Sequence, residues 1–147
     1  MATIQLPPDF KEFLRLLNSN DVEYLIVGGY AVNYYGYSRA TADLDIWIAI
    51  DAGNADRVAR VLREFGFANT RAATFLEPAK IIRMGVPPVR VEILTSISGV
   101  EFADCYARRV TADFDGVPAN VIEITDLKRN KAASGRLKDR LDLEELP

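Results

Sequence analysis

The amino-acid sequence predicts an α/β (α+β) fold in which helices flank a small mixed or mostly antiparallel sheet. Amphipathic helical segments alternate with short apolar, strand-like segments. Two strand-like pairs are also joined by turn sequences typical of hairpins. The 147 residues contain no internal repeat, low-complexity tract or linker, so we expect one domain over residues 1–147.

The chain begins with a predicted helix, strand and second helix. The first helix starts at Pro7-Pro8-Asp9, where Glu12 completes a capping-box arrangement, and its apolar residues recur at helical spacing. Three consecutive aliphatic residues within residues 22–27 indicate a strand buried on both faces. Gly28-Gly29 at the end of this strand opens the second helix, which ends near Gly36.

A second strand and a third helix follow. Residues 43–50 form the strand, and Asp51 caps a helix whose apolar stripe ends before Gly66. We expect an irregular or edge strand within residues 67–79. One hairpin then joins residues 81–84 to residues 89–94 across a Gly-Val-Pro-Pro turn.

The remaining chain is predicted to form a second hairpin and three short helices. The hairpin lies within residues 108–120 and turns at Asp115-Gly116. Thr125 is the expected cap of the second of these helices, and Ser134-Gly135 separates the second from the third. The three helices are expected over residues 102–107, 126–133 and 137–146.

The composition excludes several classes of protein and of catalytic site. The net charge is -3, so the chain as a whole is not a basic nucleic-acid-binding protein. Histidine is absent, which excludes Ser-His-Asp catalysis and zinc sites that use histidine. A single cysteine, Cys105, the lack of a leader-like segment and the lack of a long apolar run predict a cytoplasmic protein without a membrane segment.

Asp43 and Asp45 are the first candidate site. Residues i and i+2 of a strand point the same way, so both carboxylates share one face, while Leu44 and Ile46 lie on the other. Two adjacent carboxylates repel each other unless a cation or a proton lies between them. The pair could be a solvated strand face, or it could be neutralised by Arg or Lys; we favour a divalent cation because Gly28-Gly29 lies just upstream.

Three further features are weaker when each is taken alone. Gly28-Gly29 lies at a strand–helix junction, where backbone N–H groups can bind a phosphate, although the glycine pair in isolation favours a tight turn without a ligand. Glu92 could supply a third carboxylate from another strand, or it could be a surface partner of Arg90. Lys131 and Lys138 flank the Gly135 break within a basic run that is otherwise typical of a solvated helix face.

The order of these motifs resembles the polymerase-beta-like nucleotidyltransferase superfamily. It is similar in particular to small bacterial nucleotidyltransferase-like proteins of the toxin–antitoxin and abortive-infection type. The resemblance covers most of the chain from Tyr24 to Leu146, and its third acid is Glu92 where the family usually has Asp. The blocks that carry it are Gly28-Gly29, Arg39-Ala40-Thr41-Ala42-Asp43-Leu44-Asp45-Ile46, Glu92-Ile93-Leu94-Thr95-Ser96 and Asn130-Lys131-Ala132-Ala133-Ser134-Gly135-Arg136-Leu137-Lys138-Asp139.

The resemblance implies a metal-dependent site that binds a nucleoside triphosphate. Asp43, Asp45 and Glu92 would be both catalytic residues and ligands of two Mg²⁺ ions, with Mn²⁺ as a substitute. Glu92 would also help to deprotonate the acceptor. The residues implied in binding the substrate and its phosphates are Gly28, Gly29, Arg39, Thr41, Lys131 and Lys138.

Two functional hypotheses from different classes follow, with a structural domain as a third. The first is a nucleotidyltransferase that moves an NMP from an NTP to a protein, RNA or small-molecule acceptor. The second is a catalytically impaired binding module, such as an NTP sensor or a toxin–antitoxin component whose small protein partner is encoded nearby. The third is a structural α/β domain whose Asp43 and Asp45 merely bind a stray cation.

Overall fold

The computed structural model describes residues 5–37, 41, 43–86 and 89–147. Its six strands form one sheet in the order β3-β4-β2-β1-β6-β5. The pairs β2–β4 and β1–β6 are parallel, and the other neighbouring pairs are antiparallel. The sheet is therefore mixed, as predicted. The strands are β1 (Tyr24–Val27), β2 (Asp43–Ile48), β3 (Ile81–Val86), β4 (Val89–Leu94), β5 (Val110–Phe114) and β6 (Val117–Val121).

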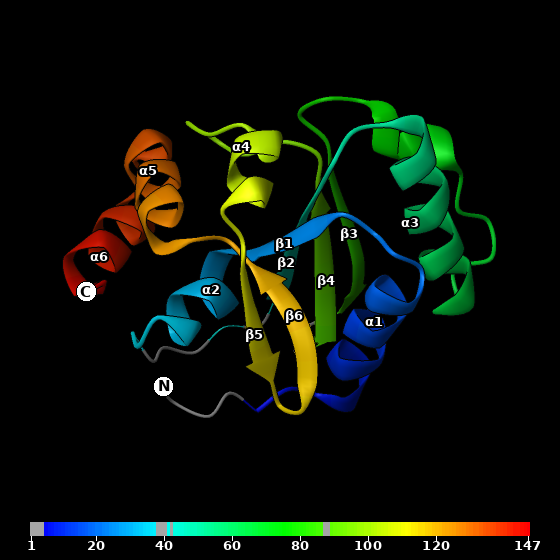
Figure 1. Ribbon diagram of the computed structural model, residues 1–147, viewed down its shortest axis with the longest axis horizontal. Helices are drawn as coiled ribbons and strands as arrows, with labels where there is room; N and C mark the ends of the chain where they lie inside the picture. The colour runs from blue at the N-terminus through cyan, green and yellow to red at the C-terminus, as the bar shows by residue number, and fades with distance from the viewer. Residues whose placement is uncertain (1–4, 38–40, 42, 87–88) are drawn as a thin grey trace.

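Helices flank the sheet in two groups. In Figure 1, α1 and α3 lie to one side of the strands, and α2, α4, α5 and α6 lie to the other. A short 3-10 helix, η1 (Ala72–Leu76), follows α3. Every helix in the described part of the chain is too short or too polar to cross a bilayer. The helices are α1 (Pro8–Ser19), α2 (Gly28–Tyr34), α3 (Ala52–Glu64), α4 (Phe102–Ala107), α5 (Ile124–Ser134) and α6 (Leu137–Glu145).

The two faces of β2 differ in polarity, as the alternation in its sequence predicts. Leu44, Ile46 and Ile48 are fully buried. Asp43 and Asp45 are only partly buried and occupy the opposite face. Burial of the aliphatic row fixes the strand register, because a slip of one residue would bring the carboxylates into the core.

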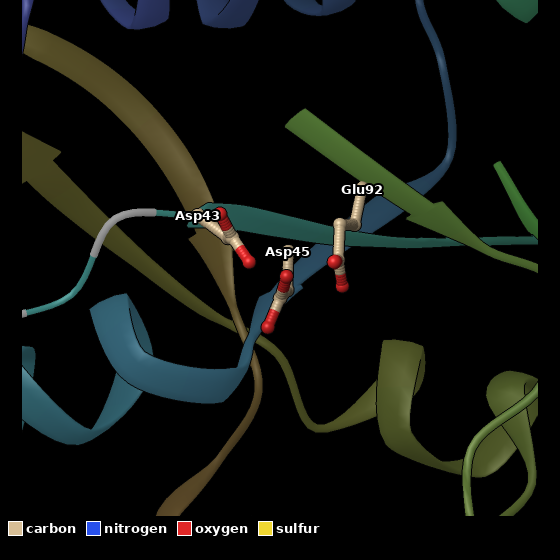
Figure 2. A group of neighbouring side chains, drawn as sticks. All are labelled: Asp43, Asp45 and Glu92. Atoms are coloured by element: carbon tan, nitrogen blue, oxygen red, sulfur yellow. The ribbon is translucent and has the colours of Figure 1, made fainter. Parts of the chain in front are cut away.

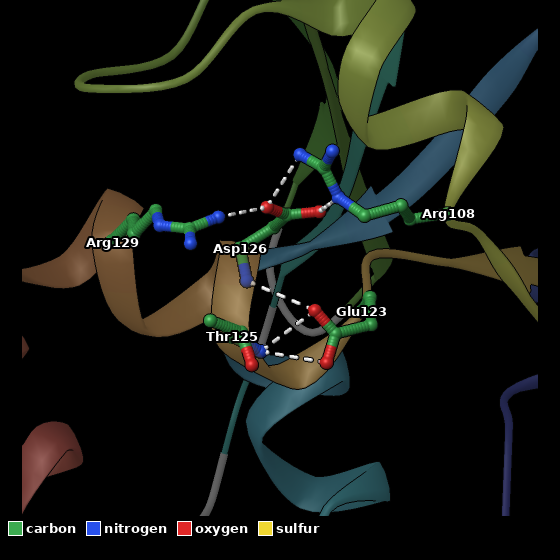
Figure 3. A network of polar contacts seen from close by, with 5 residues as sticks. All are labelled: Arg108, Glu123, Thr125, Asp126 and Arg129. Atoms are coloured by element: carbon green, nitrogen blue, oxygen red, sulfur yellow. Dashed lines mark hydrogen bonds and ion pairs between the residues drawn. The ribbon is translucent and has the colours of Figure 1, made fainter.

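Two predicted helix caps are wrong. Pro7, not Asp9, is the N-cap of α1, and no side chain caps that end, so the capping box does not form. Glu123, not Thr125, caps α5: its carboxylate accepts hydrogen bonds from the backbone N–H groups of Thr125 and Asp126 (Figure 3). The predicted cap at Asp51 is confirmed, since its side chain accepts a hydrogen bond from the backbone N–H of residue 54 at 2.8 Å.

The segment between α3 and β3 also differs from expectation. The described residues 67–79 contain η1 and no strand. Phe75 is buried, so this segment contributes one large apolar side chain to the core without joining the sheet. The first strand starts at Tyr24, two residues later than predicted, because Asp21 has a positive φ of 54° and the chain is still turning there.

Candidate functional site

The sheet brings three carboxylates together. Strand β2 carries Asp43 and Asp45, and its parallel neighbour β4 places Glu92 directly opposite Asp45. Each of the three residues offers a carboxylate oxygen, and these oxygens all lie within 4.8 Å of one another. Figure 2 shows the three side chains on the same side of the strands. The sequence alone could not place Glu92 here, because the contact depends on the register of two strands that are separated by 40 residues of chain.

Two glycines allow other side chains to approach the start of α2. Gly28 has a φ of +68°, and a Cβ atom at this position would lie 2.1 Å from Oδ2 of Asp45. A Cβ atom at Gly29 would lie 2.4 Å from Oγ1 of Thr41. The strand–helix turn is therefore in van der Waals contact with the carboxylate site. Arg39, the other residue expected in this loop, lies outside the described residues.

Arginine side chains neutralise two of the three carboxylates. Arg90 forms a bidentate pair with Asp43, with Nε–Oδ1 and Nη2–Oδ2 distances of 3.0 and 2.9 Å. Glu92 accepts a hydrogen bond from Nε of Arg83 at 2.9 Å, while its distance to Arg90 is 3.9 Å. The pairing of Glu92 with Arg90 considered above is thus the weaker of the two contacts.

Asp45 lacks such a partner. Its Oδ1 atom is buried and accepts no hydrogen bond from any described residue. Burial, followed by the nearby carboxylates of Glu92 and Asp43, raises the pKa of Asp45 to about 7. Arg90 instead holds the pKa of Asp43 below its usual value. A buried, unpaired carboxylate oxygen beside two further carboxylates fits a hard divalent cation, whose preferred ligands are oxygen atoms.

A cavity of about 310 Å³ adjoins this cluster. Gly28 and Asp45 line it from one side, and residues of α5 and the following turn line it from the other. Those residues include Lys131, Ser134 and Arg136. The cavity therefore combines anionic and cationic groups, which is the environment expected around a metal-bound phosphate.

The basic residues near this cavity have different environments. Lys131 is only 3% exposed, and its ammonium lies 3.2 Å from Asp139 and 3.0 Å from Asp142, so it joins α5 to α6. Lys138 is exposed on α6, and its charge adds to the effect of Arg90 in lowering the pKa of Asp43 and partly opposes the rise in the pKa of Asp45 that burial causes. The positive charge of Lys138 thus acts directly on the carboxylate cluster.

Arg136 is a basic cavity residue that the sequence analysis passed over in favour of Lys131 and Lys138. Its side chain is largely exposed and is held by Asp139 at 2.8 Å, and the charge of Asp45 contributes to raising the pKa of Arg136. The available signal was its position directly after Gly135, whose left-handed φ of 67° ends α5.

Comparison with known proteins gives structural matches only. No protein-family model and no curated protein matches the chain. The crystal structure of a candidate nucleotidyltransferase from Thermotoga maritima superposes with a TM-score of 0.64 and 18% identity, covering 97% of this chain and 94% of that chain. An antigenic nucleotidyltransferase-like protein from Paracoccidioides brasiliensis gives a TM-score of 0.56 and 18% identity, covering 97% of this chain and 75% of that chain.

The chain has the nucleotidyltransferase fold. The fold class expected from the sequence is therefore confirmed. Within this nucleotidyltransferase fold, the neighbouring strands β2 and β4 carry the three acids, and the turn between β1 and α2 carries the two glycines.

Proposed function

We propose that the protein is a metal-dependent nucleotidyltransferase that transfers an NMP from an NTP to an acceptor hydroxyl. The observation that carries the proposal is the buried, unpaired Oδ1 of Asp45 within a cluster of three carboxylates. Such an atom is costly in a folded protein unless a proton or a cation satisfies it. The nucleotidyltransferase fold supports the choice of reaction.

Each residue of the site then has a role. Asp43, Asp45 and Glu92 would hold Mg²⁺ or Mn²⁺, two ions in the full site, and the metal would supply charge stabilisation for an in-line displacement. Glu92 would also accept the proton of the attacking hydroxyl.

Other residues would bind the triphosphate. The backbone N–H groups at Gly28 and Gly29 would do so, together with the Thr41 hydroxyl. Arg39 remains a proposed contact as well, on the basis of its motif alone.

The basic residues beyond the glycine turn have separate proposed roles. Lys138 and Arg136 would contact the phosphates, since both act electrostatically on Asp45. Lys131, the other predicted phosphate ligand, would contribute mainly by fixing α6, because its ammonium already lies between two aspartates. The cations nearest the phosphates would thus be Lys138 of α6 and Arg136 of the turn before α6.

Transfer of label from α-³²P-labelled NTPs tests the proposal. The wild-type protein should transfer or release labelled NMP only when Mg²⁺ or Mn²⁺ is present, and Asp43→Ala plus Asp45→Ala should abolish this. Asp56→Ala plus Glu64→Ala is a matched control, because both acids are exposed on α3 across the sheet. An inactive wild type that does not bind NTP would refute the proposal.

One observation favours a binding module as the second candidate. Arg90 and Arg83 already neutralise Asp43 and Glu92, so two of the three acids have partners without a cation. A protein that binds an NTP but does not turn it over, such as an NTP sensor or a component of a two-protein complex, would tolerate these pairs. Calorimetric titration with Mg²⁺ and NTP that yields binding without any transfer would select this function.

A further inference from the structure

A second and larger cavity lies beside the carboxylate cluster. Its volume is about 630 Å³, within the range of small-molecule sites. Trp47 lies in its wall, two residues after Asp45 and on the same face of β2, which corresponds to about 7 Å along the strand. Ser96 and Ile97 line both this cavity and the smaller one that contains Asp45. The two cavities are therefore neighbours on one face of the sheet.

An aromatic cluster forms one wall of the larger cavity. The rings of Trp47 and Phe102 meet edge to face at 5.1 Å, and Phe102 stacks on Tyr106 at 5.3 Å. The guanidinium of Arg109 lies 4.1 Å from the centre of the Tyr106 ring. The cluster thus contains a cation–π contact between two of the protein's own side chains, the type of contact that aromatic rings make with a bound cation.

The charged side chains that line the larger cavity are all acidic. They are Glu23, Asp51 and Glu101, and neither Lys nor Arg is among the described lining residues. Within the described part of the chain, the carboxylates of Glu23 and Glu101 take part in no hydrogen bond or ion pair. The smaller cavity, by contrast, is lined by Lys131 and Arg136. Phosphate groups are therefore favoured in the smaller cavity and disfavoured in the larger one.

Trp47, which lines the larger cavity, also carries a polar atom without a partner. Trp47 is 1% exposed, and its indole Nε1 donates no hydrogen bond to any described residue. The hydroxyls of Thr95 and Ser96, by contrast, already accept hydrogen bonds from backbone N–H groups. A ligand oxygen in this cavity would provide an acceptor that the protein itself does not.

We propose that the larger cavity binds the acceptor substrate, and that this acceptor is a hydroxylated small molecule with a positively charged amine. This inference rests on the proposed nucleotidyltransferase function. The acidic side chains and the aromatic wall would bind the amine, and oxygen atoms of the acceptor would pair with the indole N–H. The acidic lining disfavours an RNA acceptor, whose phosphates would be repelled.

The reaction follows from the positions of the two cavities. One hydroxyl of the acceptor would extend toward Glu92 and attack the α-phosphorus of the NTP held beside Asp45. A new bond forms between the hydroxyl oxygen and the α-phosphorus, while the bond from that phosphorus to the bridging oxygen breaks. Pyrophosphate leaves with the bonding electron pair, and the hydroxyl proton passes to Glu92.

The intrinsic fluorescence of Trp47 tests the proposal directly, because it is the only tryptophan of the chain. Three probes of similar shape differ in charge: glucosamine is cationic, glucose is neutral and glucose 6-phosphate is anionic. We expect glucosamine to change the emission in a saturable manner and to bind at least five times more tightly than glucose. We expect no saturable response to glucose 6-phosphate.

Charge-neutralising variants supply the matched control. Glu23→Gln plus Glu101→Gln should weaken glucosamine binding about five- to tenfold, the range expected for two partly exposed charges. Asp104→Asn should change it less than twofold, because this exposed acid is on α4 but does not line the cavity. The side chain of Glu101 makes no capping hydrogen bond to α4, so its replacement leaves the helix intact.

Several outcomes would overturn the proposal. One is equal binding of glucosamine and glucose, and another is glucosamine binding that is insensitive to the two Gln substitutions. A Trp47 response to Mg²⁺-ATP or to oligouridylate, without one to glucosamine, would assign the cavity to a nucleobase or to RNA instead.

A catalytically inactive variant separates this proposal from the proposed function. The variant Asp43→Ala plus Asp45→Ala should keep the glucosamine response, because neither residue supplies the acids or the rings of the larger cavity. Loss of labelled NMP transfer with retained glucosamine binding therefore bears on the transferase function alone. Retained NMP transfer without glucosamine binding refutes the acceptor assignment alone.

Discussion

Substitution of Gly28 by Ala tests whether close contact between the glycine turn and Asp45 builds the site. Gly28 has a φ of +68°, and an alanine in this left-handed region costs about 1–2 kcal/mol. The new Cβ would also lie 2.1 Å from Oδ2 of Asp45, so that the carboxylate must shift. Overpacking of this kind adds about 1–3 kcal/mol. The total expected loss in the free energy of unfolding is therefore about 2–5 kcal/mol.

Gly135 provides a matched control for the backbone contribution. Its φ is +67°, yet the nearest atom to a Cβ there is a carbonyl oxygen at 3.9 Å, an ordinary contact. Gly135→Ala should therefore cost only about 1–2 kcal/mol. Urea unfolding in EDTA measures both values, and the difference between the two variants isolates the contact with Asp45.

A double-mutant cycle with Asp45→Ala completes the test. Removing the carboxylate should abolish the clash, so the cycle should give a coupling of about 1–3 kcal/mol between positions 28 and 45. The affinity for Mg²⁺-ATP should fall in Gly28→Ala and remain in Gly135→Ala. Equal costs for the two glycine variants, or additive effects in the cycle, would refute the reasoning.

Three other perturbations address the ion pairs and the metal. Lys131→Met removes the ammonium between two buried aspartates of α6 and should cost about 3–5 kcal/mol in urea unfolding, whereas a loss below about 1 kcal/mol would contradict the assigned role. Arg108 pairs with the buried carboxylate of Asp126 (Figure 3) and holds the pKa of Asp126 below its usual value. This pair therefore stabilises the fold above about pH 4, and its contribution is lost as the pH falls through the pKa of Asp126 in the folded state. The unfolding temperature of Arg108→Met should accordingly depend less on pH between about 5 and 2 than that of the wild type. The same pH dependence in both proteins would argue against a stabilising role of the Arg108–Asp126 pair. Mn²⁺ at about 100 times its Kd should stabilise the wild type by about 2.7 kcal/mol, reversibly with EDTA; the same shift in Asp45→Asn would place the ion elsewhere.

The sequence by itself determined the local features of this protein. Alternation in β2 put Asp43 and Asp45 on one face, because successive side chains of a strand point to opposite faces of the sheet. A Gly-Val-Pro-Pro sequence marked the first hairpin and Asp115-Gly116 the second, and the bounds of α4 matched the expected residues 102–107. Caps were less predictable: Glu123 displaced Thr125 because its carboxylate reaches two backbone N–H groups at once.

Only the tertiary structure decided what surrounds the two aspartates. The parallel register of β2 and β4 placed Glu92 opposite Asp45. It also placed Arg90 opposite Asp43, and these two residues form an ion pair. Packing of α6 against α5 buried Lys131 between aspartates, although the sequence analysis favoured this lysine as a phosphate ligand. These contacts join segments that are distant along the chain, so they depend on how buried faces fit together. Local periodicity carries no information about that fit, and the positions of the cations and of both cavities depend on it.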